Sequence, residues 1–194
     1  MRLLVLSDSH GDMAGLRLAG RRERPDAGIH LGDHALDAYT LTQEFSTLSV
    51  AYVHGNCDGP FPSCADTYSR RLAGVQIFAA HGHRCGVKNG LLRFHLAAQE
   101  NGAALALFGH THVPYCQEEN GIWLVNPGAC RGLYATYAVI TLEDGTVQNY
   151  AEPVNERYLR EMAYFLDYAQ SGAGPSVNTP ETALDVLKLT LGEL

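Results

Sequence analysis

The chain has 194 residues, of which 46% are hydrophobic and 18% are charged, and this balance fits one compact globular domain better than two. Its 20 glycines and 8 prolines are interspersed with apolar residues, which excludes collagen-like and wholly disordered classes. Lysine and arginine number 14 against 21 aspartates and glutamates, so at a net charge of -7 we expect no sequence-independent binding of nucleic acid.

The first third of the chain alternates between apolar runs and helical patterns. The opening run at 2–6 has the length of one buried strand and is too short for a signal peptide or a membrane span, so we expect a cytoplasmic protein with no membrane segment. A helix is predicted from 12 to 24, where Pro25 ends it. The next elements are a strand at 27–31, a helix at 37–45 and a strand at 49–54. This β-α-β-α-β order is typical of an α/β fold.

Strands dominate the following part of the chain. One helix is predicted at 88–101, and a hairpin turn is predicted at 143–145. The predicted strands are 76–80, 104–108, 121–125, 137–142 and 146–150. Because so few helices separate these strands, we expect a second sheet packed on the first, in a two-sheet sandwich flanked by helices.

The composition changes after Pro153. Residues 154–169 and 180–191 carry the apolar spacing of amphipathic helices, and a Gly-Pro loop separates them. We therefore divide the chain into a domain over 1–152 and a helical C-terminal extension over 153–194. The apolar, tyrosine-rich stripe of the extension can be buried on its own domain or on a second copy of the chain, and we expect a homo-oligomer.

Cysteine and histidine are distributed differently along the chain. The five cysteines form no CxxC pair and are odd in number, so we expect neither a disulfide framework nor a structural zinc site. Several of the nine histidines instead gather in short blocks, each of which follows a predicted strand. The blocks are Asp8-Ser9-His10, Gly32-Asp33-His34, Gly55-Asn56-Cys57-Asp58, His81-Gly82-His83 and Gly109-His110-Thr111-His112.

Ligands of α/β sheets collect at the carboxyl ends of strands, so we expect the five blocks to converge. Oxygen donors combined with imidazoles suit divalent Mn, Fe, Co, Ni or Zn. The blocks contain more candidate ligands than one tetrahedral ion needs. Two ions about 3.5–4 Å apart, bridged by one carboxylate, serve in-line displacement at phosphorus. The pattern therefore favours a metal-dependent hydrolase of phosphate esters.

The five blocks resemble, in order, the D-x-H, G-D, G-N-x-D, H-G-H and G-H-T-H motifs of the calcineurin-like metallophosphoesterases, and most closely those of the YfcE-like phosphodiesterase branch. The resemblance covers about residues 1–150. It implies an α/β fold, a four-layer αββα sandwich of two mixed sheets flanked by helices. It also implies a dinuclear metal-dependent phosphoesterase that hydrolyses a small phosphate ester through a metal-bridging hydroxide. A phosphodiesterase is expected first, and a phosphatase stays open.

The same resemblance implies a role for each candidate ligand. Asp33 would bridge two metal ions. The first ion would be held by Asp8, His10 and His112, and the second by Asn56, His81 and His110. Two divalent ions are the expected cofactors, manganese foremost, with nickel, iron, cobalt and zinc left open.

Three residues, Asn56, Cys57 and His83, are expected to act on the substrate. Asn56 would hold a phosphate oxygen. Many larger members of the family have a histidine where this chain has Cys57, and a thiol is the weaker proton donor near neutrality, so easily expelled leaving groups should be favoured. His83 has two open interpretations, a contact to the phosphate or simple packing. Ala129 stands where the N-P-G-S turn of the family has serine.

A non-catalytic protein-binding scaffold is the alternative function, because a retromer subunit resembles these enzymes in fold and works by binding other proteins. A scaffold has no chemical need to keep every metal ligand. Here all seven ligand positions carry the residue types that the family uses, so we expect an enzyme.

Overall fold

The computed structural model describes residues 1–59, 64–132 and 135–150, and the predicted extension over 153–194 lies outside them. The first sheet consists of β1 (Arg2–Leu6), β2 (Ala27–His30), β3 (Ser49–Tyr52), β9 (Ala138–Glu143) and β10 (Thr146–Tyr150). Its order is β10-β9-β1-β2-β3, in which β1, β2 and β3 are parallel and β9 runs antiparallel to both of its neighbours. This sheet is therefore mixed.

The second sheet is also mixed and five-stranded. It consists of β4 (Thr67–Leu72), β5 (Val75–Ala80), β6 (Leu105–Leu107), β7 (Tyr115–Glu119) and β8 (Ile122–Asn126). In the order β4-β5-β6-β8-β7, the three central strands are parallel and the two edge strands are antiparallel to their neighbours. The helices are α1 (Met13–Glu23), α2 (Ala35–Glu44) and α3 (Leu92–Glu100), with a short 3₁₀ turn, η1 (His83–Cys85).

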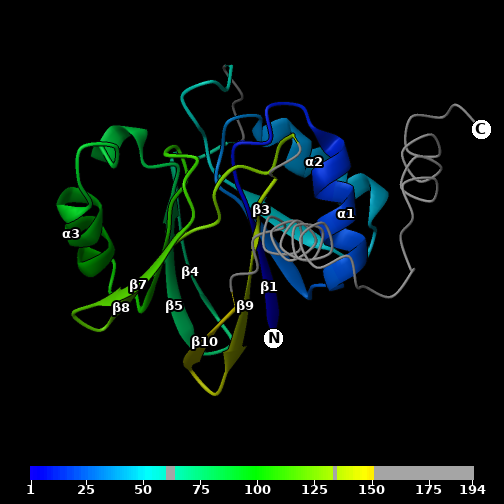
Figure 1. Cartoon of the computed structure of the whole chain (residues 1–194). Helices are drawn as coiled ribbons and strands as arrows, with labels where there is room; N and C mark the ends of the chain where they lie inside the picture. The colour runs from blue at the N-terminus through cyan, green and yellow to red at the C-terminus, as the bar shows by residue number, and fades with distance from the viewer. Residues whose placement is uncertain (60–63, 133–134, 151–194) are drawn as a thin grey trace, which may run out of the picture. The chain divides into compact units, whose positions relative to one another are not determined.

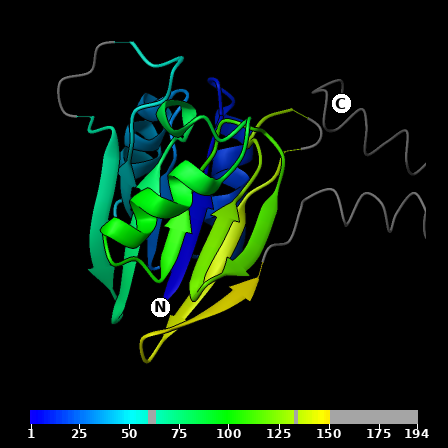
Figure 2. The same cartoon turned by 90° about the vertical axis from the view of Figure 1, so that its left-hand side faces the viewer.

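Alternating side chains of the strands separate the apolar core into three clusters. In β1, Leu3 and Val5 face the second sheet, whereas Leu4 and Leu6 face α1 and α2. The outer face of the second sheet packs on α3, where Phe94 is fully buried. Figure 1 shows the resulting layers, with α3 on one side and α1 and α2 on the other, and in Figure 2 α3 crosses in front of the second sheet. The predicted four-layer αββα sandwich is confirmed.

The main differences from the prediction concern two strands and two helices. Strands β4 and β7 were not predicted, and α2 begins at Ala35 instead of 37. The helix predicted at 88–101 is shorter, because α3 spans only Leu92–Glu100. None of the helices in the described part of the chain has both the length and the apolar character that crossing a membrane requires.

Candidate metal centre

The loops that carry the five motif blocks follow β1, β2, β3, β5 and β6, and hydrogen bonds tie several of them together. The Asp8 amide donates to the Gly32 carbonyl (3.0 Å), and the Gly109 amide donates to the His81 carbonyl (3.1 Å). His81 Nδ1 lies 2.7 Å from the Leu31 carbonyl oxygen, which links a loop of the second sheet to one of the first. The structure thus brings the five blocks to one edge of the sandwich.

Five of the candidate ligands have a left-handed backbone, a conformation that costs a non-glycine residue of order 1 kcal/mol or more and that clusters at functional sites. Aspartate and histidine are among the side chains that adopt it most readily. The residues and their φ angles are Asp8 (53°), His10 (47°), Asp33 (56°), His110 (67°) and His112 (60°). The left-handed backbone at these positions therefore sets the direction of the five side chains.

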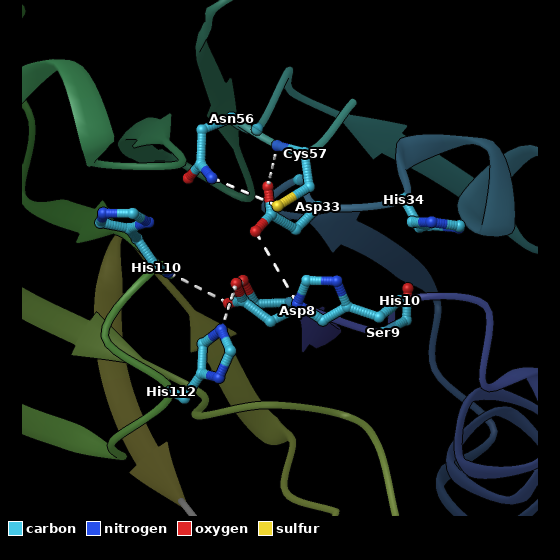
Figure 3. A network of polar contacts seen from close by, with 12 residues as sticks. Asp8, Ser9, His10, Asp33, His34, Asn56, Cys57, His110 and His112 are labelled. Carbon is cyan, nitrogen blue, oxygen red and sulfur yellow. Dashed lines mark hydrogen bonds and ion pairs between the residues drawn. The ribbon is translucent and has the colours of Figure 1, made fainter. Parts of the chain in front are cut away.

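A first group of ligand atoms comes from Asp8, His10, Asp33 and His112, and these atoms all lie within 4.8 Å of one another. His112 Nε2 is 3.1 Å from Asp8 Oδ1, and His10 Nε2 is 3.8 Å from Asp33 Oδ2 (Figure 3). The other oxygen of Asp8, Oδ2, accepts hydrogen bonds from the Ser7 hydroxyl and from the His110 amide. These two bonds hold Asp8 with Oδ1 turned towards the group.

A second group comes from Asp33, His81 and His110, again within 4.8 Å. Around His81 Nε2 lie His110 Nδ1 at 3.2 Å, Asn56 Oδ1 at 3.1 Å and Asp33 Oδ1 at 3.4 Å. Because the Leu31 carbonyl requires a proton on His81 Nδ1, Nε2 is the nitrogen of this ring that is available to a metal ion, and it faces the oxygens of Asn56 and Asp33. A proton or a metal ion at this position would offset the repulsion between the lone pairs that meet there.

Asp33 belongs to both groups and offers a different oxygen to each. Its side chain is almost fully buried, with 3% of its surface exposed. Two further buried atoms in the first group, Asp8 Oδ1 and His10 Nε2, make no hydrogen bond, and their ion-pair contacts are with His112 and Asp33 of the same group. Unpartnered buried polar atoms are costly, and a bound cation would satisfy them. These oxygens and imidazole nitrogens therefore fit divalent metal ions, and the residues could hold them.

The electrostatics of the centre favour the protonation states that bind metal. Burial opposes ionisation of Asp33, but the hydrogen bond from the Cys57 amide (2.8 Å) and the adjacent His81 outweigh it, so the pKa of Asp33 is lowered. Burial lowers the pKa of His10 and of His110, more than nearby carboxylates raise it. Ionised carboxylate and neutral imidazole are the ligating forms.

Asp58, the last residue of the third block, organises the centre without reaching the ligand groups. Its carboxylate accepts hydrogen bonds from four backbone amides, those of Asp33 (3.0 Å), His34 (2.8 Å), Ala35 (2.7 Å) and Gly55 (2.7 Å). It thereby fastens the loop after β3 to the loop after β2 and caps the start of α2. The sequence analysis placed Asp58 in a motif but gave it no role.

Gly55 explains why this packing needs a residue without a side chain. A Cβ atom at this position would collide with the backbone nitrogen and a carboxylate oxygen of Asp33. The loop that carries Asn56 can approach Asp33 only with glycine here.

Comparisons with known proteins agree with this geometry. A family model described as the calcineurin-like phosphoesterase superfamily domain matches residues 1–145, which include the whole candidate centre. The chain belongs to this superfamily. Its members use divalent metals and hydrolyse phosphate esters, which agrees with the ligand groups described above.

Two curated members of the superfamily are similar over most of their length. "Probable metallophosphoesterase YsnB" of Bacillus subtilis is 34% identical over 166 residues, covering 80% of this chain and 94% of that protein. "Phosphodiesterase MJ0936" of Methanocaldococcus jannaschii is 24% identical over 174 residues, covering 80% of this chain and 100% of that protein.

Solved structures of the same fold include a predicted phosphoesterase and Vps29. A Streptococcus pneumoniae protein described as a predicted phosphoesterase matches with a TM-score of 0.62 at 26% identity, covering 78% of this chain and 97% of the other. Wild-type Vps29 of Entamoeba histolytica, in complex with zinc, matches with a TM-score of 0.63 at 16% identity, covering 79% and 99%. At this identity the second likeness shows the fold alone.

The remaining residues that the superfamily motifs single out lie at different distances from the centre. Cys57 is exposed, and its pKa is raised by burial of the thiol within the loop and by Asp33. The His83 ring is 5.3 Å from that of His81, and its buried Nδ1 has no hydrogen-bond partner. His34 lies outside both ligand groups, with its ring 6.1 Å from that of His10 (Figure 3). Its Nδ1 lies 3.9 Å from Asp37 Oδ2.

A buried hydrogen-bond network of Ser9, His30 and Asp37 links the first two motif loops. Ser9, between two candidate ligands, donates to Asp37 Oδ2 (2.7 Å), and its oxygen lies 3.0 Å from His30 Nε2. The Gly32 amide donates to His30 Nδ1 (3.2 Å), so Nε2 carries the proton. Neither His30 nor Asp37 belongs to a motif block, so the sequence pattern assigns no role to either of them.

Proposed function

We propose that the protein is a phosphodiesterase that uses two divalent metal ions, one in each ligand group, with Asp33 bridging them. The observation that carries the proposal is the position of Asp33, whose two carboxylate oxygens face two separate sets of ligands. In this assignment Asp8, His10 and His112 complete the first site, and Asn56, His81 and His110 complete the second.

When bound, such a metal pair supplies an acidic water molecule as nucleophile and offsets the charge that develops on the phosphate oxygens. The chain holds the ligands in register through the buried carboxylate of Asp33 and the four amides that Asp58 gathers. In this assignment Asn56 Oδ1, which lies 3.1 Å from His81 Nε2, would bind the metal, and Asn56 Nδ2 would donate to a phosphate oxygen. Cys57 and His83 border the second site, and either can deliver a proton to a leaving group.

Manganese is the metal we propose first. Imidazoles and oxygens, with no thiolate among the ligands, suit manganese, and nickel, iron, cobalt and zinc remain open on the same donor chemistry. The substrate is a small phosphate ester. A cytoplasmic location and a homo-oligomeric state stay predictions of the sequence.

The experiment that tests the proposal compares hydrolysis of bis(p-nitrophenyl) phosphate and p-nitrophenyl phosphate, two esters with the same leaving group. Metal-free protein should be inactive, and adding Mn²⁺ should restore hydrolysis, with the diester favoured in kcat/KM. A clear preference for the monoester would replace phosphodiesterase by phosphatase. No hydrolysis of either ester with Mn²⁺, Co²⁺ or Zn²⁺ would contradict an enzyme.

The likeness to Vps29 supports a second candidate, a protein-binding scaffold. The two functions differ in what removal of metal does. For an enzyme, removal of the metal abolishes turnover, and Asp33→Ala also abolishes turnover. For a scaffold, partner binding persists in the metal-free protein. We favour the enzyme because all seven candidate ligand positions carry ligating residue types and three of them, Asp8, Asp33 and His81, are buried.

A further inference from the structure

The loop after β8 is fastened to the β1–α1 segment that carries Asp8 and His10. The Cys130 amide donates to the Ser7 carbonyl oxygen (2.8 Å), and the Gly132 amide donates to Asp12 Oδ2 (2.8 Å). Gly15 in α1 leaves room for this loop, because a Cβ atom there would lie 3.3 Å from Cys130 O and Sγ. Ser7 and Asp12 flank the first metal group in the chain, so the loop lies beside that group.

The start of the same loop is fastened to the block that carries His110 and His112. Asn126 is buried, and its Nδ2 donates to the Gly109 carbonyl (2.9 Å) and to Thr111 Oγ1 (3.0 Å). Its Oδ1 accepts from the Gly128 amide (2.8 Å). The loop is thus held at both ends by residues next to candidate ligands.

Arg131 is the residue between the two fastened positions, and its side chain is exposed. Within the described residues, none of the ion pairs includes Arg131. Asp12, on which the Gly132 amide is fastened, uses Oδ1 for the Ala14 amide and Oδ2 for the Gly132 amide, so both of its oxygens have backbone partners. Within the described residues, an exposed arginine without an ion pair therefore lies on the loop that is fastened beside the first metal group.

The charges of the proposed centre balance without Arg131. Two divalent ions bring four positive charges, which Asp8, Asp33, a hydroxide ion and a singly charged phosphodiester neutralise. The guanidinium adds one positive charge that this set leaves without a partner, on a chain whose net charge is -7. Arginine binds phosphate through paired N–H donors, more strongly than it binds neutral acceptors.

We propose that Arg131 binds a second phosphate group of the substrate, outside the scissile phosphodiester, so that the preferred substrates are phosphodiesters whose retained portion carries a further phosphate. This inference rests on the proposed phosphodiesterase function. Arg131 selects the substrate and takes no part in bond cleavage. Lys88, which is exposed and follows the His81-Gly82-His83 block in the chain, is the competing anchor.

The test uses two substrates with one leaving group, thymidine 5′-(p-nitrophenyl phosphate) and the same compound with a 3′-phosphate. With Mn²⁺-loaded protein, the 3′-phosphate should lower KM by about tenfold and leave kcat within about twofold. Arg131→Gln should abolish this preference and Arg131→Lys should retain part of it. Arg70→Gln, which removes an exposed arginine from the edge strand β4, is the matched control and should retain it fully.

Calorimetric titration of the same proteins with thymidine 3′,5′-bisphosphate and thymidine 5′-phosphate measures the anchor without turnover. The unaltered protein should bind the bisphosphate about tenfold more tightly than the 5′-phosphate, and Arg131→Gln should bind the two ligands equally. The Arg131 proposal would be overturned if the unaltered protein had equal KM values for the two diesters and equal affinities for the two nucleotides. It would also be overturned if the preference for the 3′-phosphate survived in Arg131→Gln or was lost in Lys88→Gln. Failure to hydrolyse either diester would instead overturn the phosphodiesterase proposal, and the titration would still decide the role of Arg131.

Discussion

Asp58 carries no metal in our assignment, yet four backbone amides of the candidate centre depend on it. Its value lies in accepting hydrogen bonds with both oxygens, which an isosteric amide cannot do. Sequence reasoning can find Asp8, His10 and Asp33, because their residue types and order form a motif. It cannot assign Asp58, His30 or Asp37, because hydrogen bonds to backbone groups far along the chain leave no pattern in the sequence.

We predict that Asp58→Asn weakens Mn²⁺ binding by about 10- to 100-fold, because the replaced oxygen can no longer accept from the loop that positions Asp33. Competition of the protein with a fluorescent chelator measures this affinity. Asp66→Asn is the matched control, since Asp66 pairs with Arg84 outside the ligand groups and should bind Mn²⁺ normally. Unchanged affinity in Asp58→Asn would show that the four amide bonds do not support the centre.

Cys57 should make hydrolysis sensitive to the leaving group. Burial and Asp33 raise the pKa of its thiol, so it keeps its proton at neutral pH and is a weak acid for an expelled alkoxide. We predict that Cys57→His accelerates hydrolysis of phenyl esters more than that of p-nitrophenyl esters. The plot of log kcat against leaving-group pKa measures the difference.

Two outcomes would contradict this account of Cys57. A flat plot for the unaltered protein would mean that leaving-group protonation does not limit the rate. Identical plots for Cys57→Ser and the unaltered protein would mean that His83 or water donates the proton instead of Cys57. Cys85→Ser, a partly buried thiol outside the motif blocks, controls for the loss of a thiol.

At the scale of the elements, the central strands are predictable from sequence and the edge strands of the second sheet are not. Strand β5 is an apolar run because both of its faces are buried. Strands β4 and β7 carry Arg70, Arg71, Glu118 and Glu119 and contain no buried residue, so they lack the apolar signal of a strand. Charged edge strands resist pairing with other chains. The same charged side chains interrupt the apolar alternation from which a strand is predicted.

His30, the last residue of β2, should make stability depend on pH. Burial lowers its pKa from 6.5 to about 4, although Asp37 opposes the shift. Below pH 6.5 His30 is therefore protonated in the unfolded chain but stays neutral in the folded chain. The free energy of unfolding decreases as the pH falls towards 4. The full loss is on the order of 3 kcal/mol.

Urea unfolding of the protein and of His30→Gln across this pH range measures the effect. The variant is less stable at neutral pH, because it loses part of the network with Ser9 and Gly32. The difference between the two proteins should shrink as the pH falls, since the variant has no group to titrate at this position. A difference that stays constant with pH would refute the buried neutral imidazole.

At the scale of the whole molecule, the five motif blocks lie between residues 8 and 112, and both sheets end by residue 150. We therefore predict that a chain ending at Glu152 retains both metal ions. If residues 153–194 form the contact between copies, as the sequence analysis expects, its native mass falls relative to the full chain. Light scattering and metal analysis test both points.

The outcomes of this truncation separate the two roles of the extension. An unchanged native mass with retained activity would remove the expected homo-oligomeric contact. Loss of both metal ions would show that residues 153–194 support the centre, contrary to their assignment as a separate extension. The fold itself was predictable at this scale because ordered motifs at strand ends define one architecture, whereas the extension carries no comparable motif.

The central claim is that one chain holds two metal ions bridged by Asp33. The most direct measurement is the metal content of Mn²⁺-loaded protein together with its electron paramagnetic resonance spectrum. We predict two ions per chain and an exchange-coupled multiline spectrum, and in Asp33→Asn at most one ion with the spectrum of isolated Mn²⁺. Asp144→Asn, the same substitution at a similar left-handed position with φ of 48°, should match the unaltered protein. One ion per chain with an uncoupled spectrum in the unaltered protein would contradict the bridged pair.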